Sequence, residues 1–162
     1  MTIIERLRQY KELDPHKIAL IVDDKKYTYG DLYDAILSID INDTSRIVNV
    51  AQTKESPKHI VALIQSQSFV EQLVLWLAGL YTGYIPMVCH NEMDTEYVEE
   101  LARIIAYKGV APLADFGVLT SGTTGRPKPL WRSESSWREF FDIQNDIFHI
   151  NKDTKIFLHG SF

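Results

Sequence analysis

The sequence lacks the features of several common classes of protein. Its 162 residues contain a single cysteine, Cys89, so the chain cannot form an internal disulfide. The longest strongly apolar run, residues 73–80, is too short to cross a bilayer. The N-terminus has no apolar segment of the kind found in signal peptides. The net charge of −5 does not favour a nucleic-acid-binding surface, which needs a basic patch. A reducing, cytoplasmic setting is therefore the simplest expectation.

Two common nucleotide-binding motifs are also absent. No G-x-G-x-x-G sequence occurs, which excludes the dinucleotide fingerprint of Rossmann domains. A Walker A loop places its lysine directly after the second glycine, whereas Arg126 and Pro127 follow Gly125 in this chain. Because no kinase motif occurs either, an unrelated phosphotransferase is only a weak alternative.

The most informative segment is a loop rich in hydroxyl groups and glycine. It follows a short apolar run, Phe116–Leu119, which is typical of a buried strand. Glycines let backbone N–H groups approach an anion closely, hydroxyls donate further hydrogen bonds, and a lysine adds positive charge. An ordinary surface loop without a ligand is the alternative, but such loops rarely combine these residues in this order. The predicted polyphosphate-binding loop consists of Thr120, Ser121, Gly122, Thr123, Thr124, Gly125, Arg126, Pro127 and Lys128.

Composition and patterning predict the fold class. Apolar residues make up 45% of the chain and charged residues 24%, as in ordinary globular proteins, and the length suffices for one domain with its own core. Strand-like and helix-like segments alternate, which predicts an α/β fold with a mostly parallel sheet flanked by helices. Ligands bind at the carboxyl ends of the strands in such sheets. The loop after Leu119 lies at one of these ends.

Periodicity, capping residues and breakers predict the individual elements. Thr28, with Asp31 at the third helical position, and Asp94 are predicted to cap helices. Helices are expected at residues 3–13, 29–39, 69–80, 95–107 and 135–149, and strands at 18–22, 27–29, 47–51, 60–64, 84–89, 116–119 and 155–159.

The loop resembles the signature phosphate loop of the acyl-adenylate-forming superfamily. This superfamily includes acyl-CoA synthetases, aryl-acid ligases, luciferases and the adenylation domains of peptide synthetases. Its pattern is Thr/Ser-Ser-Gly-Thr/Ser-Thr/Ser-Gly-x-Pro-Lys-Gly, and the chain departs from it only at the last position, where Pro129 replaces glycine. Less specific blocks at residues 16–32, 69–88 and 153–162 are also similar to the family. The resemblance implies part of the large N-terminal, AMP-binding domain of these enzymes.

The resemblance also implies a function. The parent enzyme would be an ATP-dependent ligase that activates a carboxylic acid as an acyl-adenylate. It would then pass the acyl group to the thiol of coenzyme A or of a carrier protein. Lys128 would offset the charge of the leaving pyrophosphate. The residues implied to bind the ATP phosphates are Thr120, Ser121, Gly122, Thr123, Thr124, Gly125 and Lys128. The ligands of Mg²⁺ lie mostly in later family elements, so no catalytic or metal-binding residue is assigned in this chain.

The chain departs from the family pattern in three ways, and the first two support an alternative. Pro129 removes a backbone N–H group and restricts the backbone of Lys128 toward extended conformations. The segment between Glu92 and Phe116 is also short for the family. The chain ends at Phe162, before the later family elements, so residues 1–162 are expected to be a single N-terminal fragment without the C-terminal lid domain. Such a fragment would be inactive alone. The alternative is a truncated, non-catalytic binding module that retains the fold and self-associates through its uncovered apolar surface.

Four other residues are weaker candidates. Arg126 and Arg132 could add charge near the phosphates, but exposed arginines are usually solvated. His159 follows the last expected strand, where a lone histidine is more often structural. Cys89 has no basic neighbour in the sequence, which favours a buried thiol over a nucleophile.

Overall fold

The computed structural model describes residues 1–42, 46–51, 60–90, 93–120, 127–151 and 153–157. The described residues form a five-stranded sheet and a separate two-stranded hairpin. In spatial order the sheet consists of β3 (Ile47–Ala51), β4 (Ile60–Ile64), β5 (Ile85–Val88), β6 (Phe116–Leu119) and β7 (Pro129–Arg132).

Strand direction divides the sheet into a parallel centre and antiparallel edges. The central strands β4, β5 and β6 run parallel, whereas β3 pairs antiparallel with β4 and β7 antiparallel with β6. The predicted α/β class is confirmed, and the expected parallel pairing holds at the centre of a sheet that is mixed as a whole. The sequence patterns do not predict β7, which begins at Pro129. β7 lies at the edge of the sheet, and on its open side a backbone N–H group would have no neighbouring strand to donate to. A proline, which has no N–H group, is therefore accommodated there.

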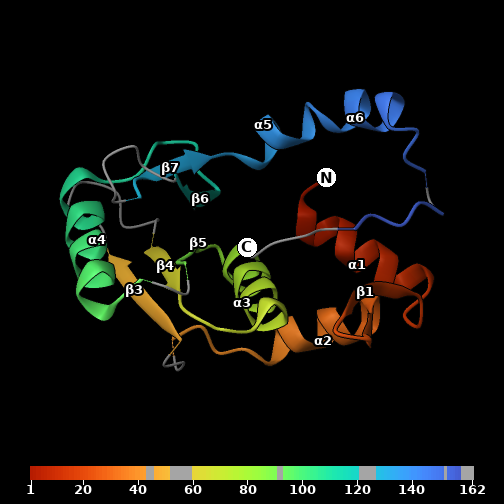
Figure 1. Ribbon diagram of the computed structural model, residues 1–162, viewed down its shortest axis with the longest axis horizontal. Helices are drawn as coiled ribbons and strands as arrows, with labels where there is room; N and C mark the ends of the chain where they lie inside the picture. The colour runs from red at the N-terminus through yellow and green to blue at the C-terminus, as the bar shows by residue number, and fades with distance from the viewer. Residues whose placement is uncertain (43–45, 52–59, 91–92, 121–126, 152, 158–162) are drawn as a thin grey trace.

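Helices cover both faces of the sheet (Figure 1). One face carries α1 (Ile3–Leu13), α2 (Tyr29–Ser38) and α3 (Phe69–Thr82), whose apolar side chains form one core with Ile64 and Phe116. The opposite face carries α4 (Thr95–Lys108), which forms a second core with β4 and β5. The predicted buried helix at 69–80 is confirmed, and it extends to Thr82.

Local capping determines where the helices begin. Thr28 and Asp31 form the predicted capping box of α2, in which the Thr28 hydroxyl oxygen accepts from the Asp31 N–H group at 3.0 Å. Asp94 caps α4 as predicted, since its carboxylate accepts from the Tyr97 N–H group. Gly83 ends α3 at a φ of 81°, a left-handed conformation that glycine adopts without steric cost.

A hairpin lies beside these helices. It joins β1 (Ile18–Val22) to β2 (Lys25–Thr28) through a two-residue turn at Asp23 and Asp24. Both aspartates have positive φ angles, 48° and 64°, as a tight hairpin turn of this kind requires. The predicted hairpin is confirmed, with its second strand beginning two residues earlier than expected.

The C-terminal part of the described chain differs from expectation. The predicted helix at 135–149 is two short helices, α5 (Glu134–Arg138) and α6 (Phe141–Ile147). None of the residues of α6 is buried, because no described element packs over its apolar side chains. Residues 155–157 of the strand expected at 155–159 are not in a strand, and 158–159 lie outside the described residues. In the part of the chain that the structure describes, no helix combines the length and hydropathy needed to cross a membrane.

The side chain of Phe116 connects the sheet to the helices on one face. It is only 1% exposed. Its ring makes edge contacts with Trp76 of α3, at 5.3 Å between centroids, and with Trp137 of α5, at 5.2 Å. Such aromatic pairs stabilise beyond the area that they bury. Phe116 therefore fixes the position of β6 against both helices.

Replacing Phe116 should lower the stability of the whole fold. We expect Phe116→Ala to reduce the free energy of unfolding by about 3–5 kcal/mol, since it removes a buried ring and leaves a cavity. Equilibrium urea denaturation followed by circular dichroism measures this change. Phe157→Ala is the matched control, because Phe157 is 96% exposed. Equal effects of the two substitutions would contradict the central role of Phe116.

Candidate functional site

The carboxyl ends of β4, β5 and β6 meet at one edge of the sheet because the three strands run parallel. The hydrogen-bond ladder continues past the strand ends, since the Cys89 N–H group donates to the Ile64 carbonyl oxygen at 2.8 Å. Directly after β6 comes Thr120, the first residue of the predicted phosphate loop. The loop therefore begins at the edge where ligands bind in α/β sheets.

The structure describes only the two ends of this loop. Of the residues predicted to bind phosphate, Thr120 and Lys128 are described and both are exposed. The remaining five lie outside the described residues, and their predicted role stays a prediction: Ser121, Gly122, Thr123, Thr124 and Gly125.

Thr120 and Lys128 close the base of the loop. The Thr120 N–H group donates to the Lys128 carbonyl oxygen at 3.0 Å, and the Lys128 N–H group donates to Thr120 Oγ1 at 3.3 Å. Thr120 therefore has a positioning role that sequence reasoning did not foresee. Pro129 follows at the start of β7, opposite Leu119, so the β6–β7 ladder begins immediately below this closed pair.

A tyrosine from α4 provides a third anchor. The Tyr97 hydroxyl donates a hydrogen bond to the Pro127 carbonyl oxygen, 30 residues along the chain. Asp94 caps the same helix one turn earlier, so the cap that fixes the start of α4 also fixes Tyr97. The loop is thus held from the sheet by Thr120 and from the helix layer by Tyr97.

The Lys128 side chain emerges beside an apolar cavity between α4 and β7. No acidic side chain among the described residues lies within ion-pair distance of its ammonium group. The cavity has a volume of about 360 Å³, which is within the range of small-molecule sites. Its walls are mainly apolar side chains of α4 together with the segment around β7. The lining residues are Tyr97, Glu100, Leu101, Ile104, Ile105, Lys108, Gly109, Pro127, Lys128, Pro129 and Trp131.

Sequence reasoning missed this cavity because it needs β7, a strand that the patterns do not predict. The only local signal is the spacing of Tyr97, Leu101 and Ile105, which puts three residues on one face of α4. That spacing equally indicates a helix face packed in a core, which is where Leu101 and Ile105 also belong.

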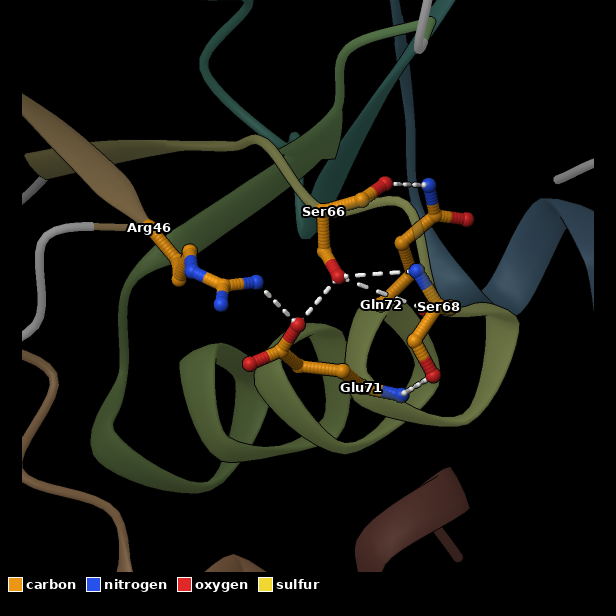
Figure 2. Close-up of polar contacts among 5 residues, drawn as sticks. All are labelled: Arg46, Ser66, Ser68, Glu71 and Gln72. Carbon is orange, nitrogen blue, oxygen red and sulfur yellow. Dashed lines mark hydrogen bonds and ion pairs between the residues drawn. The ribbon is translucent and has the colours of Figure 1, made fainter.

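A second polar cluster lies at the carboxyl end of β4 (Figure 2). The Glu71 carboxylate at the start of α3 accepts from the Arg46 guanidinium at 2.5 Å and from the Ser66 hydroxyl. The Gln72 side-chain amide donates to the Ser66 carbonyl oxygen at 2.6 Å, and the Ser68 hydroxyl oxygen accepts from the Glu71 N–H group. These groups satisfy one another, so the cluster anchors α3 to the segments before β3 and after β4.

The sequence contained a signal for this cluster. Ser68 and Glu71 have the spacing of a capping box. Ser68 does cap α3, but the Glu71 side chain turns to Arg46 and Ser66 instead of returning to the Ser68 N–H group.

Cys89 lies at the same edge of the sheet but is 1% exposed. Burial disfavours the thiolate and raises the pKa of the Cys89 thiol to about 12. The expectation of a buried thiol is confirmed. Across the described ranges, no group of three or more His, Cys, Asp and Glu side chains is placed to hold a metal ion.

Comparisons with known proteins give the same family that the loop resembles. No protein-family model matches the chain. Over 98% of its length the chain is 25% identical to "Putative long chain fatty acid-CoA ligase VraA" of Staphylococcus aureus strain COL. It is 26% identical over 83% of its length to the protein of the same name in Staphylococcus epidermidis. The chain spans 37% of the length of the Staphylococcus aureus relative.

Solved structures give the same fold. The o-succinylbenzoate CoA synthetase MenE of Bacillus subtilis, in complex with an acyl-adenylate intermediate, has a TM-score of 0.61 at 15% identity; the match covers 94% of this chain and 47% of MenE. The N-terminal subdomain of NpsA from Klebsiella oxytoca has a TM-score of 0.52 at 17% identity, covering 82% of this chain and 42% of that subdomain chain. Another MenE structure contains ATP and a magnesium ion. These structures show that the fold is that of the N-terminal domain of such enzymes, and the sequence match to VraA agrees with the resemblance of the loop.

Removing the Tyr97 hydroxyl should loosen the base of the loop. We expect Tyr97→Phe to cost about 1 kcal/mol in the free energy of unfolding, since one hydrogen bond is lost. It should also speed amide hydrogen exchange around Thr120 and Lys128. Tyr81→Phe, on the exposed side of α3, is the control. Unchanged exchange at the loop base in Tyr97→Phe would show that the hydroxyl does not hold the loop.

The Cys89 thiol should be unreactive in the folded protein. Its pKa of about 12 leaves almost no thiolate at pH 8, and a buried sulfur is inaccessible to reagents. We expect a thiol-specific reagent such as dithionitrobenzoate to label the protein only after denaturation, with one thiol per chain. Rapid labelling of the native protein would contradict the burial of Cys89.

Proposed function

We propose that this chain supplies the ATP-phosphate-binding part of a ligase that activates a carboxylic acid as an acyl-adenylate. The observation that carries the proposal is the loop that starts at Thr120. It has the family's sequence up to Lys128, and it follows the parallel strand β6 at the ligand-binding edge of the sheet. The similarity to the ligase VraA along 98% of the chain supports the same proposal.

In the proposed reaction, a carboxylate oxygen attacks the α-phosphorus of ATP. A new bond forms between the carboxylate oxygen and the α-phosphorus. The bond between the α-phosphorus and the bridging oxygen breaks, and pyrophosphate leaves with the electron pair. Negative charge accumulates on the leaving group. Lys128 is suited to stabilise this charge because no described acidic group competes for its ammonium. Catalysis of this kind depends mainly on positioning and charge stabilisation.

The anchored ends of the loop would reduce the cost of binding. Ser121, Thr123 and Thr124 are proposed to bind the β- and γ-phosphates through their hydroxyls. The backbone N–H groups near Gly122 and Gly125 would assist them. Because Thr120 and Tyr97 hold both ends of the loop, fewer conformations are lost when ATP binds. Mg²⁺ is proposed as the accompanying cation, with ligands mostly outside this chain.

The acyl acceptor is proposed to be a thiol, with coenzyme A the favoured one. The relative VraA is named as a fatty acid-CoA ligase, and the structural neighbour MenE as an o-succinylbenzoate CoA synthetase. A carrier-protein thiol is the other acceptor that the family resemblance allows. The cytoplasmic setting expected from the sequence stays a prediction.

The alternative function is a binding module that retains the fold without the chemistry. Two observations favour it: Pro129 replaces the final glycine of the loop, and the segment between Glu92 and Phe116 is short for the family. The two functions differ in their consequence, since only the first predicts acid-dependent exchange between pyrophosphate and ATP.

Replacement of Lys128 should weaken ATP binding. For the chain of residues 1–162 we expect weak binding of Mg·ATP, and Lys128→Ala should weaken it about 10-fold or more because a charge-assisted contact to phosphate is lost. Ligand-observed NMR titration measures the affinity. Lys155→Ala removes an exposed lysine that follows Lys128 by 27 positions in the sequence and should change nothing. Equal affinities of both variants would remove Lys128 from the site.

Pyrophosphate exchange separates the ligase from the binding module. It would be measured on the full-length native gene product against a panel of carboxylic acids, with Lys128→Ala and Thr123→Ala as variants. Exchange with one class of acid, reduced in both variants, supports the ligase and identifies its substrate. A folded protein that binds ATP without exchange in the presence of any acid supports the non-catalytic module.

A further inference from the structure

Pro129 is the residue at which the loop departs from the family pattern, and its place in the sheet shows what the proline costs. The Thr120 N–H group donates to the Lys128 carbonyl oxygen, as in a hydrogen-bonded pair of an antiparallel ladder. Such pairs alternate with pairs that share no hydrogen bond, so the next pair, Leu119 and Pro129, is of the second kind. The Pro129 nitrogen therefore points to the open side of β7, and the proline removes no hydrogen bond from the sheet.

The peptide unit before Lys128 is held from two layers of the structure. Its carbonyl group belongs to Pro127, and the oxygen accepts from the Tyr97 hydroxyl of α4. Its N–H group belongs to Lys128 and donates to Thr120 Oγ1 at 3.3 Å. Because a peptide unit is planar and rigid, the contact to the helix and the contact to the sheet together fix its orientation.

The peptide unit after Lys128 is restricted as well. The Lys128 carbonyl oxygen accepts from the Thr120 N–H group at 3.0 Å, and the ring of Pro129 disfavours helical backbone angles at the residue before it. Lys128 thus lies between two peptide units of fixed orientation, which fixes the direction of its Cα–Cβ bond. A cation held in this way loses less conformational freedom when an anion binds.

We propose that Tyr97, Thr120 and Pro129 are positioning residues that orient Lys128 toward a polyphosphate, and that the proline strengthens binding at this site. In place of the glycine of the family pattern, the chain has a residue that narrows the backbone conformations of the lysine before it. The departure at Pro129 therefore does not by itself count against phosphate binding. This inference rests on the proposed function and deepens it, since the anion is the polyphosphate of ATP.

Pro129→Gly tests the inference directly, because it introduces the residue of the family pattern and breaks no hydrogen bond. For the chain of residues 1–162 we expect the dissociation constant of Mg·ATP, measured by ligand-observed NMR titration, to rise about 2- to 5-fold, the effect of releasing one restricted backbone position. Tyr97→Phe should raise it in the same direction. Pro112→Gly is the matched control, since Pro112 is exposed and lies outside the loop, and it should leave the affinity unchanged. Circular dichroism would verify that each variant folds.

A double-mutant cycle separates the positioning of Lys128 from a general loss of order. If Pro129 acts through the lysine, Pro129→Gly should weaken Mg·ATP binding in the otherwise unchanged chain but not in the chain that carries Lys128→Ala. A merely structural role would give the same fold-change in both backgrounds. Amide hydrogen exchange at Lys128 should also be faster in Pro129→Gly, because its N–H group is held less firmly against Thr120.

The outcomes distinguish a failure of this inference from a failure of the proposed function. Binding of Mg·ATP that Lys128→Ala weakens, but that Pro129→Gly leaves unchanged or tightens, would overturn the inference and leave the phosphate site in place. Equal losses from Pro129→Gly with and without Lys128→Ala would overturn it too. A folded chain that binds no Mg·ATP would overturn the proposed function, and the inference with it.

Discussion

The packing of β6 between the two cores is the constraint on which the rest of the structure depends. On one face of the strand, Phe116 contacts Trp76 and Trp137. On the other face, a Cβ atom at Gly117 would lie 2.1 Å from Met87 Cε and 2.9 Å from Trp131 Cζ3. A side chain at this position would compete for space with the Met87 and Trp131 side chains, so glycine leaves room for both of them to cover β6. Thr120 follows three residues later, and its position is a consequence of this packing.

Polar contacts between distant segments then complete the frame around the loop. The Glu134 carboxylate accepts from the Ile3 N–H group at 3.0 Å, and the Glu134 N–H group donates to the Asp115 carboxylate at 2.8 Å. The start of α1, the residue before β6 and the start of α5 are thereby joined. Burial raises the pKa of Glu134, as expected for a carboxyl group held partly away from water. These contacts hold the β6–β7 hairpin, and with it the loop, against the helix layer.

The accuracy of the sequence-based predictions follows the range of the interactions involved. Thr28 and Asp94 identified helix starts correctly because a cap is formed by residues three positions apart. The strands at 47–51 and 60–64 were also correct, since their apolar content is a local property. The helix predicted at 135–149 was wrong in its continuity. Its apolar periodicity was real, but periodicity alone does not say what packs against the face.

The sequence by itself determined the α/β class and the ends of most helices, and it carries the residue pattern on which the proposed loop chemistry rests, because each depends on residue types at short spacings. Only the tertiary structure decided that Pro129–Arg132 forms β7, since an edge strand is stabilised by its neighbour β6 and not by its own pattern. It alone placed Tyr97 at the base of the loop, 30 residues from Pro127. The same holds for the exposure of α6. Contacts between residues far apart in the chain depend on how the layers pack, and no local pattern records that packing.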